Sequence, residues 1–547
     1  MTTEFVIALF LLLQLRLHGQ SCPVRCQCFT PAKVLCADDA MKSVPVNITS
    51  AVEELTIMAT SVTRIGPDAF EDSPEIQKIT FLNNFIVEVS EGAFDELTKL
   101  QELEISGNRN LSEIRTDVFT SLTNLKKLFL NFNKFGTLDT GLFDNLQNLE
   151  ILHLKGNLLS TLPEDLFHQL HQLHVLDLSQ NMISVVSKDL FCGLTKLETL
   201  FLNENQIVTL QSNVFSNVVR LQELSLQGNK IAALPKDIFS NLGGLKELNL
   251  RGNVLKELAP GTFHPPLTHL NLEQNQLTKL SPALFSQLSC LTYLNLAKNK
   301  LAAVPEEAFQ NLTELRFLSL ADNQIRSLPK MVFQDLTNVN KLYLQKNNLS
   351  SLDLELFQNL TNLEHLGLFQ NKLRTVPEGL FDAVIILPFL SLHDNPWTCD
   401  CNLLYLYRLI QYSTYSIQHS GRIYCQSPEP LKGQSLVFLR QEQLVCPAQN
   451  FTTCIRDLSS SQRRPQAGKD ISEISEAQIF ESQKDTRQCA LSEGNGVIYI
   501  KCSISKCPKV KVETEVSNEH GKKINQISVG NLPEDSQCLN TIISITV

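Results

Sequence analysis

One spacing of leucines and asparagines repeats along most of the chain. The string L-x-x-L-x-L-x-x-N recurs between residues 52 and 395, and its asparagines are 24 residues apart except for one interval of 25 and one of 22. A first copy, VEELTIMAT, has Thr60 at the asparagine position, which makes fifteen copies. The asparagines are Asn84, Asn108, Asn133, Asn157, Asn181, Asn205, Asn229, Asn253, Asn275, Asn299, Asn323, Asn347, Asn371 and Asn395.

A phenylalanine keeps the same period. It lies ten residues after Thr60 or after the asparagine of a copy, and eleven residues after it at Phe119. Both markers therefore change register together, as expected of one structural unit that is repeated. The phenylalanines are Phe70, Phe94, Phe119, Phe143, Phe167, Phe191, Phe215, Phe239, Phe263, Phe285, Phe309, Phe333, Phe357 and Phe381.

The L-x-L part of each copy predicts a short β-strand, because its two leucines alternate with an exposed residue. A single strand of this kind cannot bury its apolar side, but stacked copies form a parallel sheet over a continuous core. The asparagine amide can satisfy backbone groups where the chain leaves the strand. We expect the phenylalanines to stack under the convex side, so that the array curves into a horseshoe-shaped solenoid with the sheet on its concave face. An amphipathic helical array does not fit, since L-x-L lacks the 3.6-residue period.

Two clusters of four cysteines flank the repeats. The open ends of a repeat array expose core and strand edges and need caps. We therefore predict disulfide-bonded caps over residues 22–51 and 396–447, with Trp397, the only tryptophan, covering the last repeat. Zinc ligation is the weaker alternative for these clusters, because the chain begins like an exported protein. The cysteines are Cys22, Cys26, Cys28 and Cys36 before the repeats, and Cys399, Cys401, Cys425 and Cys446 after them.

The composition changes after the second cap. Residues 448–488 are polar and have no repeat, which predicts a linker. Residues 489–547 contain alternating segments such as VIYIKCSI and TIISITV, which predict a small disulfide-bonded β domain. Its four cysteines allow three pairings, and Cys454 is left over. These four are Cys489, Cys502, Cys507 and Cys538.

The start of the chain and its overall charge indicate where the protein works. Residues 1–21 contain the apolar run FVIALFLLL and are predicted to be a signal peptide, although Glu4 stands where a positive residue is usual. No other stretch is long and apolar enough to span a bilayer. The formal net charge of −10 argues against a general nucleic-acid binder. We therefore expect a secreted, extracellular protein.

The motifs of common enzyme sites are not found in the sequence. It contains no H-E-x-x-H, G-x-S-x-G, P-loop or G-x-G-x-x-G, and no histidine begins an H-x-x-E. His168, His171 and His174 could suggest a metal, but variable surface side chains are the simpler interpretation. We expect no catalytic residues, no metal site, no cofactor and no enzyme activity of the chain itself.

Two further cysteines lie within the repeats. Cys192 and Cys290 are four copies apart, or roughly 20 Å along the stack at about 4.8 Å per strand. A disulfide needs Cα atoms within about 7 Å, so these two cannot pair with each other. We expect both to be buried free thiols.

The concave sheet is the expected binding surface of such an array. Aromatic residues occur at its exposed positions, and those in four successive copies form our predicted partner-binding patch. Ordinary variation at surface positions is the alternative. Glycans on N-x-S/T sites should decorate the flanks and leave the sheet accessible. The patch is Tyr293, Phe317, Tyr343 and Phe369, and the glycosylation sites are Asn47, Asn110, Asn311, Asn348, Asn359 and Asn450.

The complete layout resembles a known family. The segment C-P-x-x-C-x-C-F from Cys22, the repeats, the cap NPWTCDCNLLYLYRLIQ with LKGQ and QLVCP, and the tail RQCALSEGNGVIYIKCSISKC are similar to subunit 2 of carboxypeptidase N, an extracellular leucine-rich-repeat protein. The resemblance implies a leucine-rich-repeat solenoid with the disulfides Cys22–Cys28, Cys26–Cys36, Cys399–Cys425 and Cys401–Cys446.

The same resemblance implies a function. It suggests a circulating, non-catalytic glycoprotein that holds and stabilises the catalytic subunit of a secreted zinc carboxypeptidase. That enzyme removes C-terminal Arg or Lys from kinins and anaphylatoxins, and the assembly would be a heterotetramer of two carrier–enzyme pairs. The alternative is a soluble leucine-rich-repeat recognition or adhesion protein that binds another extracellular ligand.

Overall fold

The computed structural model describes residues 22–446, apart from 47, 264–265, 283, 385–386 and 413–416, and the backbone of five strands between residues 488 and 546. The chain divides into two compact units, Met1–Gln449 and Asn450–Val547. The predicted signal peptide, nearly all of the predicted linker, Asn47, Asn450, Cys454, Cys507 and Cys538 lie outside the described residues.

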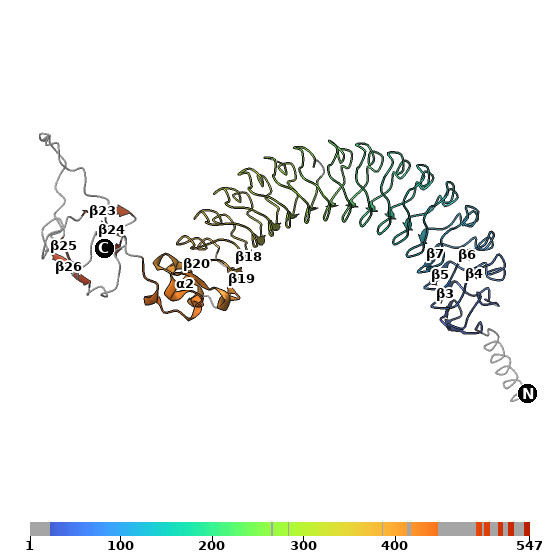
Figure 1. The fold of residues 1–547 in the computed structure, drawn as a ribbon, viewed down its shortest axis with the longest axis horizontal. Coiled ribbons are helices and arrows are strands. Elements are labelled where there is room, and N and C mark those ends of the chain that lie inside the picture. The colour runs from blue at the N-terminus through green and yellow to red at the C-terminus, as the bar shows by residue number, and fades with distance from the viewer. Residues whose placement is uncertain are drawn as a thin grey trace, which may run out of the picture. The chain divides into compact units, whose positions relative to one another are not determined.

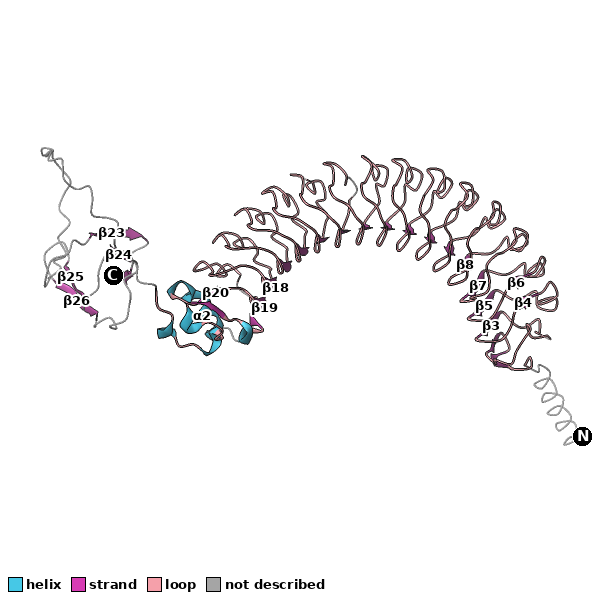
Figure 2. Ribbon diagram, in the orientation of Figure 1, coloured by secondary structure: helices cyan, strands magenta, loops and turns pink. Residues whose placement is uncertain are grey.

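Fifteen repeat strands form one parallel sheet along the inner side of the first unit's arc (Figures 1 and 2). Each strand pairs with the strand of the next copy, and the residues of one copy lie opposite their equivalents in the next. This is the solenoid that the leucine spacing predicts. The strands are β3 (Glu54–Met58), β5 (Lys78–Leu82), β7 (Glu102–Ser106), β8 (Lys127–Phe129), β9 (Ile151–His153), β10 (Val175–Asp177), β11 (Thr199–Phe201), β12 (Glu223–Ser225), β13 (Glu247–Asn249), β14 (His269–Asn271), β15 (Tyr293–Asn295), β16 (Phe317–Ser319), β17 (Lys341–Tyr343), β18 (His365–Gly367) and β19 (Phe389–Ser391).

Both leucines of each L-x-L point into the core. In β12 and just after it, Leu224 and Leu226 are fully buried, whereas Glu223 before them is half-buried. The same alternation holds from copy to copy, and these side chains belong to one continuous apolar cluster. Because each copy packs on the one before it, the core extends along the array without a break.

The asparagines form a ladder of hydrogen bonds between copies. Asn229 accepts a bond from the backbone N–H of Ile207 at 3.0 Å. Its amide donates to the carbonyls of Leu202 at 2.9 Å and Leu226 at 3.0 Å. One buried side chain thus satisfies three backbone groups, two of them in the preceding copy. The ladder continues across the 22-residue copy, where Asn275 makes the equivalent bonds to Leu255 and Leu250.

The phenylalanines form a second column, on the convex side. Phe215 and Phe239 are buried and stacked, with ring centroids 6.4 Å apart. The other stacked pairs of this column lie 6.0 to 6.5 Å apart. Strands on the inner side are only about 4.8 Å apart. The outer column is therefore more widely spaced than the inner sheet, and the array bends towards the sheet (Figure 1).

The N-terminal cap closes one end of the sheet. Strands β1 (Cys26–Thr30) and β2 (Lys33–Cys36) form an antiparallel hairpin, and β2 pairs in parallel with the first repeat strand, β3. The disulfides Cys22–Cys28 and Cys26–Cys36 hold this hairpin. They are the pairs that the family resemblance implies.

The C-terminal cap continues both columns of the array. Strand β21 (Ile417–Gln418) pairs with β19, and helix α2 (Leu404–Tyr412) covers the last copy. Tyr405 stacks on Phe381 at 6.4 Å and donates a hydrogen bond to Asp382. Burial raises the pKa of Tyr405 to about 12.

The predicted role of Trp397 agrees with its position. Trp397 begins strand β20 (Trp397–Thr398), which pairs with β22 (Cys425–Ser427), and its side chain is fully buried in the core. The disulfides Cys399–Cys425 and Cys401–Cys446 link the segments around it.

Two short strands, β4 (Arg64–Ile65) and β6 (Glu88–Val89), form a separate pair near the other end of the array.

The prediction of two buried thiols is wrong. Cys290 is exposed and Cys192 is half-buried, and neither forms a disulfide. Each lies in a turn beside a residue that fills the core, Phe191 for Cys192 and Leu291 for Cys290. The turn directs the neighbouring cysteine side chain away from the core.

The second unit contains five strands. They are β23 (Gln488–Gly494), β24 (Val497–Ser503), β25 (Val512–Ser517), β26 (Lys523–Val529) and β27 (Thr541–Thr546). β24 pairs antiparallel with both β23 and β27, and β25 pairs with β26. The alternating sequence predicts this β domain, and in it Cys489 lies opposite Cys502 in the backbone register.

The ladder predicts a large effect of a single buried amide on stability. Asn229→Ala leaves the buried N–H of Ile207 without a partner, and a buried unsatisfied group costs about 1–3 kcal/mol. It also removes one of the two amide bonds that the Leu202 and Leu226 carbonyls accept, the others coming from Asn205 and Asn253. We expect the free energy of unfolding, measured by urea denaturation followed by circular dichroism, to fall by about 3 kcal/mol. Asn249→Ala is the control, because Asn249 is half-buried on the concave face, where water can replace its bonds to Gln227 and to the Arg251 N–H, and we expect its loss to cost about 0.5 kcal/mol. Equal losses in the two variants would contradict a structural role for the ladder.

Candidate functional site

The side chains on the concave face lie in three rows. The first row precedes the L-x-L of each copy, the second row is its middle residue, and the third row follows it. In β15 and the residues after it, these positions are Tyr293, Asn295 and Ala297. Since strands pair in register, each row continues from one copy to the next. The leucines between the rows face the core, so only these rows can contact a partner on this face.

The structure brings three of the four predicted patch residues together. Tyr293 and Phe317 are neighbours in the first row and stack with their ring centroids 4.3 Å apart. Phe317 also contacts Tyr343, in the second row of the next copy, at 5.5 Å. All three side chains are half-buried. They form a diagonal line of aromatic rings across three strands.

Phe369 belongs to a neighbouring group of rings. It lies in the third row and stacks on His393 at 4.6 Å. In the first row of the same copies, His365 stacks on Phe389 at 4.2 Å. Phe389 is 45% exposed, which is unusual for a phenylalanine. We call the combined set the aromatic surface, and it consists of Tyr293, Phe317, Tyr343, His365, Phe369, Phe389 and His393.

Sequence reasoning missed the two histidines of this surface. His365 and His393 lie in the same rows as Phe317 and Phe369, so reading the repeats as rows and counting imidazoles as rings would have found them. Another imidazole, His269, contacts Tyr293 at 5.7 Å on the N-terminal side.

The rings of the aromatic surface are uncharged at neutral pH, whereas Lys341 lies between Phe317 and His365 in the first row and the Asp394–Arg422 ion pair lies beside His393. Burial is the main cause that lowers the pKa of His365 and His393, so both imidazoles stay neutral. Burial likewise raises the pKa of Tyr293 and Tyr343, which keeps both phenols protonated. A neutral, partly desolvated set of rings is chemically suited to apolar and aromatic contacts with another protein.

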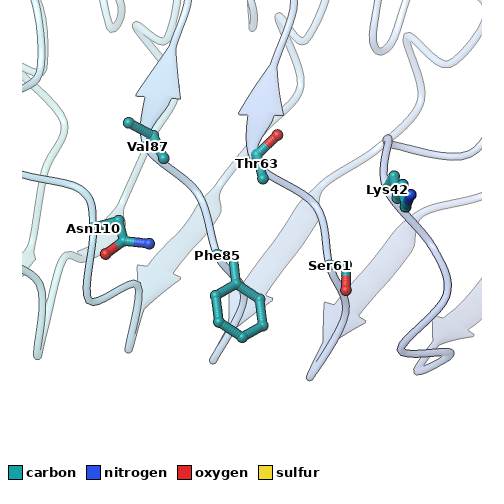
Figure 3. A pocket seen from close by; sticks show the side chains of 6 residues that line it. All are labelled: Lys42, Ser61, Thr63, Phe85, Val87 and Asn110. Atoms are coloured by element: carbon teal, nitrogen blue, oxygen red, sulfur yellow. The ribbon is translucent and has the colours of Figure 1, made fainter.

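A second concavity lies outside the sheet, between the first copies (Figure 3). This lateral hollow has a volume of about 490 Å³ and is lined by residues that follow the first strands. Phe85 and Val87 are 56% and 52% exposed within it. Asn110, one of the predicted glycosylation sites, also lines it. The full lining is Lys42, Ser61, Thr63, Phe85, Val87 and Asn110.

The four described glycosylation sites are accessible. Asn110, Asn311, Asn348 and Asn359 are all exposed, and all lie in loops rather than in the concave strands. The Asn359 amide donates one hydrogen bond to the Gln334 carbonyl at 2.9 Å. Their occupancy stays a prediction.

The described residues do not group three or more His, Cys, Asp or Glu side chains as a metal site would. Of the three clustered histidines, His171 has its Nδ1 3.2 Å from the carbonyl oxygen of Gly193. In the same part of the chain, no helix is long and apolar enough to cross a membrane.

Two relatives align with part of the chain. Carboxypeptidase N subunit 2 of Mus musculus is 36% identical over 124 residues, which is 23% of this chain and 21% of that protein. The Homo sapiens protein of the same name is 37% identical over 124 residues, again 23% of this chain and 21% of that protein. The chain thus spans about a fifth of the length of these relatives. Among solved structures, a leucine-rich-repeat protein of Leptospira interrogans is 30% identical, with a TM-score of 0.61 over 70% of this chain and 94% of that one.

The repeats themselves match a family. The pattern described as "Leucine rich repeat" matches overlapping segments at residues 50–109, 107–159, 123–183, 147–207, 172–231, 219–275, 265–325, 291–349, 318–373 and 337–396. These segments cover more than half of the chain and coincide with the fifteen strands of the solenoid. The chain therefore belongs to the leucine-rich-repeat family.

Proposed function

We propose that this chain is a secreted, non-catalytic carrier that binds and stabilises the catalytic subunit of a zinc carboxypeptidase of the carboxypeptidase N type. The observation that carries the proposal is the aromatic surface, which lies open on the concave face of a rigid array. The similarity to carboxypeptidase N subunit 2 supplies the class of partner. The chemistry, removal of a C-terminal Arg or Lys, would reside in that partner.

The geometry of the aromatic surface supports a protein partner. Its rings come from five successive copies, β15 to β19, and their backbones are fixed by the sheet and the asparagine ladder. Such rings are already ordered before binding, so little side-chain entropy is lost when a partner contacts them. Aromatic side chains that are held in this way are typical anchors of protein interfaces.

The predicted glycans would leave this surface free. Asn348 and Asn359 both lie in the loop between β17, the strand of Tyr343, and β18, the strand of His365. We propose that glycans at these positions protect the loops while a partner occupies the concave face. A heterotetramer of two carrier–enzyme pairs is the corresponding proposal for the assembly.

The first prediction from this proposal concerns capture of the partner. When the tagged chain and the small catalytic carboxypeptidase of the same organism are co-expressed, we expect them to elute together as a complex that releases C-terminal Arg. We also expect the enzyme to keep its activity at a higher temperature than alone, because binding to the folded state stabilises it. If the chain elutes without the enzyme, the carrier assignment fails and the alternative of another extracellular ligand gains support.

The second prediction locates the contact. Replacing Tyr343 and Phe369 together by alanine should weaken partner binding at least about tenfold, since interface anchors cost about 2 kcal/mol or more each. Phe129→Ala is the matched control, because Phe129 is also an aromatic residue of the concave face and contacts His153 at 5.0 Å, far from the aromatic surface along the array. Affinity can be measured by biolayer interferometry, and thermal midpoints check folding. Unchanged affinity of the double variant would exclude the aromatic surface as the interface.

The third prediction concerns the lateral hollow. We propose that the first sugar of a glycan on Asn110 packs over Phe85 and Val87, which are otherwise exposed. Asn110→Gln should remove one glycan, seen by mass spectrometry, and increase the fluorescence of a bound apolar dye. Adding Phe85→Ser to that variant should reverse the increase. An unmodified Asn110 in the secreted protein would contradict this proposal.

A further inference from the structure

Two neighbouring glutamates on the concave face are unpaired among the residues that the structure describes. Glu223 and Glu247 are register partners in the first row of β12 and β13, where adjacent strands are about 4.8 Å apart. Neither carboxylate forms an ion pair or a side-chain hydrogen bond with another described residue. Like charges directly opposite each other destabilise a sheet. The pair therefore has an electrostatic cost that nothing within the described residues offsets.

At the start of the array, the charged side chains of the same row form ion pairs. There the charges alternate in sign from strand to strand and pair with one another. Lys33 bonds Glu54 at 2.7 Å, and Glu102 bonds Lys78 at 2.6 Å and Lys127 at 3.4 Å. Partial burial acts against ionisation of Glu102, but the hydrogen bond and charge of Lys78 keep the pKa of that carboxyl below its usual value. The unpaired glutamates are thus an exception within their own row.

The two carboxylates border a depression of the sheet. This acidic hollow has a volume of about 400 Å³ and extends from β11 to β15. Phe201 lines it on the N-terminal side and Tyr293, the first ring of the aromatic surface, lines it on the other. Burial, and secondarily the charge of Glu247, raises the pKa of Glu223. The nearest basic side chain of the third row, Arg251, is already paired with Glu273, which also bonds Lys298 at 2.7 Å.

This combination suits one kind of ligand group. Two carboxylates a strand apart can accept bonds from the planar donor fork of a guanidinium. The rings of Phe201 and His269, on the strands to either side of the two carboxylates, favour its flat cation. A bound metal ion would need more oxygen ligands than two carboxylates provide. An arginine side chain fits both the charge of the hollow and the rings in its lining.

We infer that the acidic hollow binds an arginine, or less well a lysine, that projects from the protein on the concave face. The inference rests on the proposed function only in that this face binds a protein, and it holds whether or not that protein is a carboxypeptidase. Because Tyr293 borders both regions, one partner would place its basic side chain between Glu223 and Glu247 and an apolar surface on Phe317 and Tyr343.

The test uses a short dye-labelled peptide, Phe-Arg-Phe-Gly amide, and its citrulline counterpart, which has the same shape without the charge. Fluorescence anisotropy with the full chain should show binding of the arginine peptide and at least about tenfold weaker binding of the citrulline peptide, as expected for a charge-assisted pair. Glu223→Gln with Glu247→Gln should weaken binding of the arginine peptide to the citrulline level. Glu102→Gln, in the paired part of the row, is the matched control and should leave binding unchanged.

Folding does not obscure this test. Removing the like charges should leave the thermal midpoint of the double variant equal to or above that of the wild type, and the single variant Glu247→Gln changes only an exposed carboxylate. Equal binding of both peptides, or equal weakening by Glu102→Gln, would overturn the inference, because the attraction would then be general or non-electrostatic. Peptide binding without capture of a carboxypeptidase would support the acidic hollow while the carrier role fails.

Discussion

The structure depends on how the backbone N–H and C=O groups find hydrogen-bond partners where the chain leaves each three-residue strand. Such a strand is too short to be stable alone, and the turn after it would bury polar groups without partners. The ladder asparagine resolves this from the copy of Asn133 onwards, since Asn229 and its equivalents bond backbone groups of their own copy and of the one before. Earlier in the array, the Asn84 side chain bonds only the preceding copy and that of Asn108 only its own. The amide therefore couples each copy to its neighbour at the point where pairing would otherwise end. Stability is the sum of such neighbouring contacts, so the array can be long without a large globular core.

This constraint also determines which positions remain for function. The leucines fill the core, the asparagines complete the turn, and the phenylalanines separate the copies on the convex side. Only the three concave rows and the loop surfaces can vary without loss of the fold. Curvature presents the rows together on one open face, because the convex column is more widely spaced than the sheet. Rings that are 24 residues apart in sequence thereby come within contact distance, as Tyr293 and Phe317 do at 4.3 Å.

The repeat explains how much of this the sequence could predict. Spacing alone predicts the strands, the ladder and the aromatic column, since each follows from one period, and it also places Tyr293 beside Phe317. The spacing also gives the row of each residue, but it does not predict that Phe369 stacks on His393 instead of continuing the line from Tyr343, because that depends on side-chain conformation. The exposure of Cys290 follows from the repeat as well, since the equivalent residues Glu314 and Asn338 directly precede a buried core residue and are exposed in the same way. The acidic hollow could not be predicted, because it requires knowing that Arg251 bonds Glu273 and leaves Glu223 unpaired.

Charge is distributed differently at the two ends of the concave face. At its N-terminal end the charges of the first row are mutually paired, so a partner that displaced them would lose existing ion pairs. At its C-terminal end the rings are neutral and already partly desolvated, so covering them costs little polar solvation. Between these two ends lie Glu223 and Glu247. They are the only residues of the first row in the described strands that carry the same charge on adjacent strands. A partner that is basic at one edge and apolar beyond it would gain from both features in only one orientation, and electrostatic complementarity of this kind fixes register more than it adds affinity.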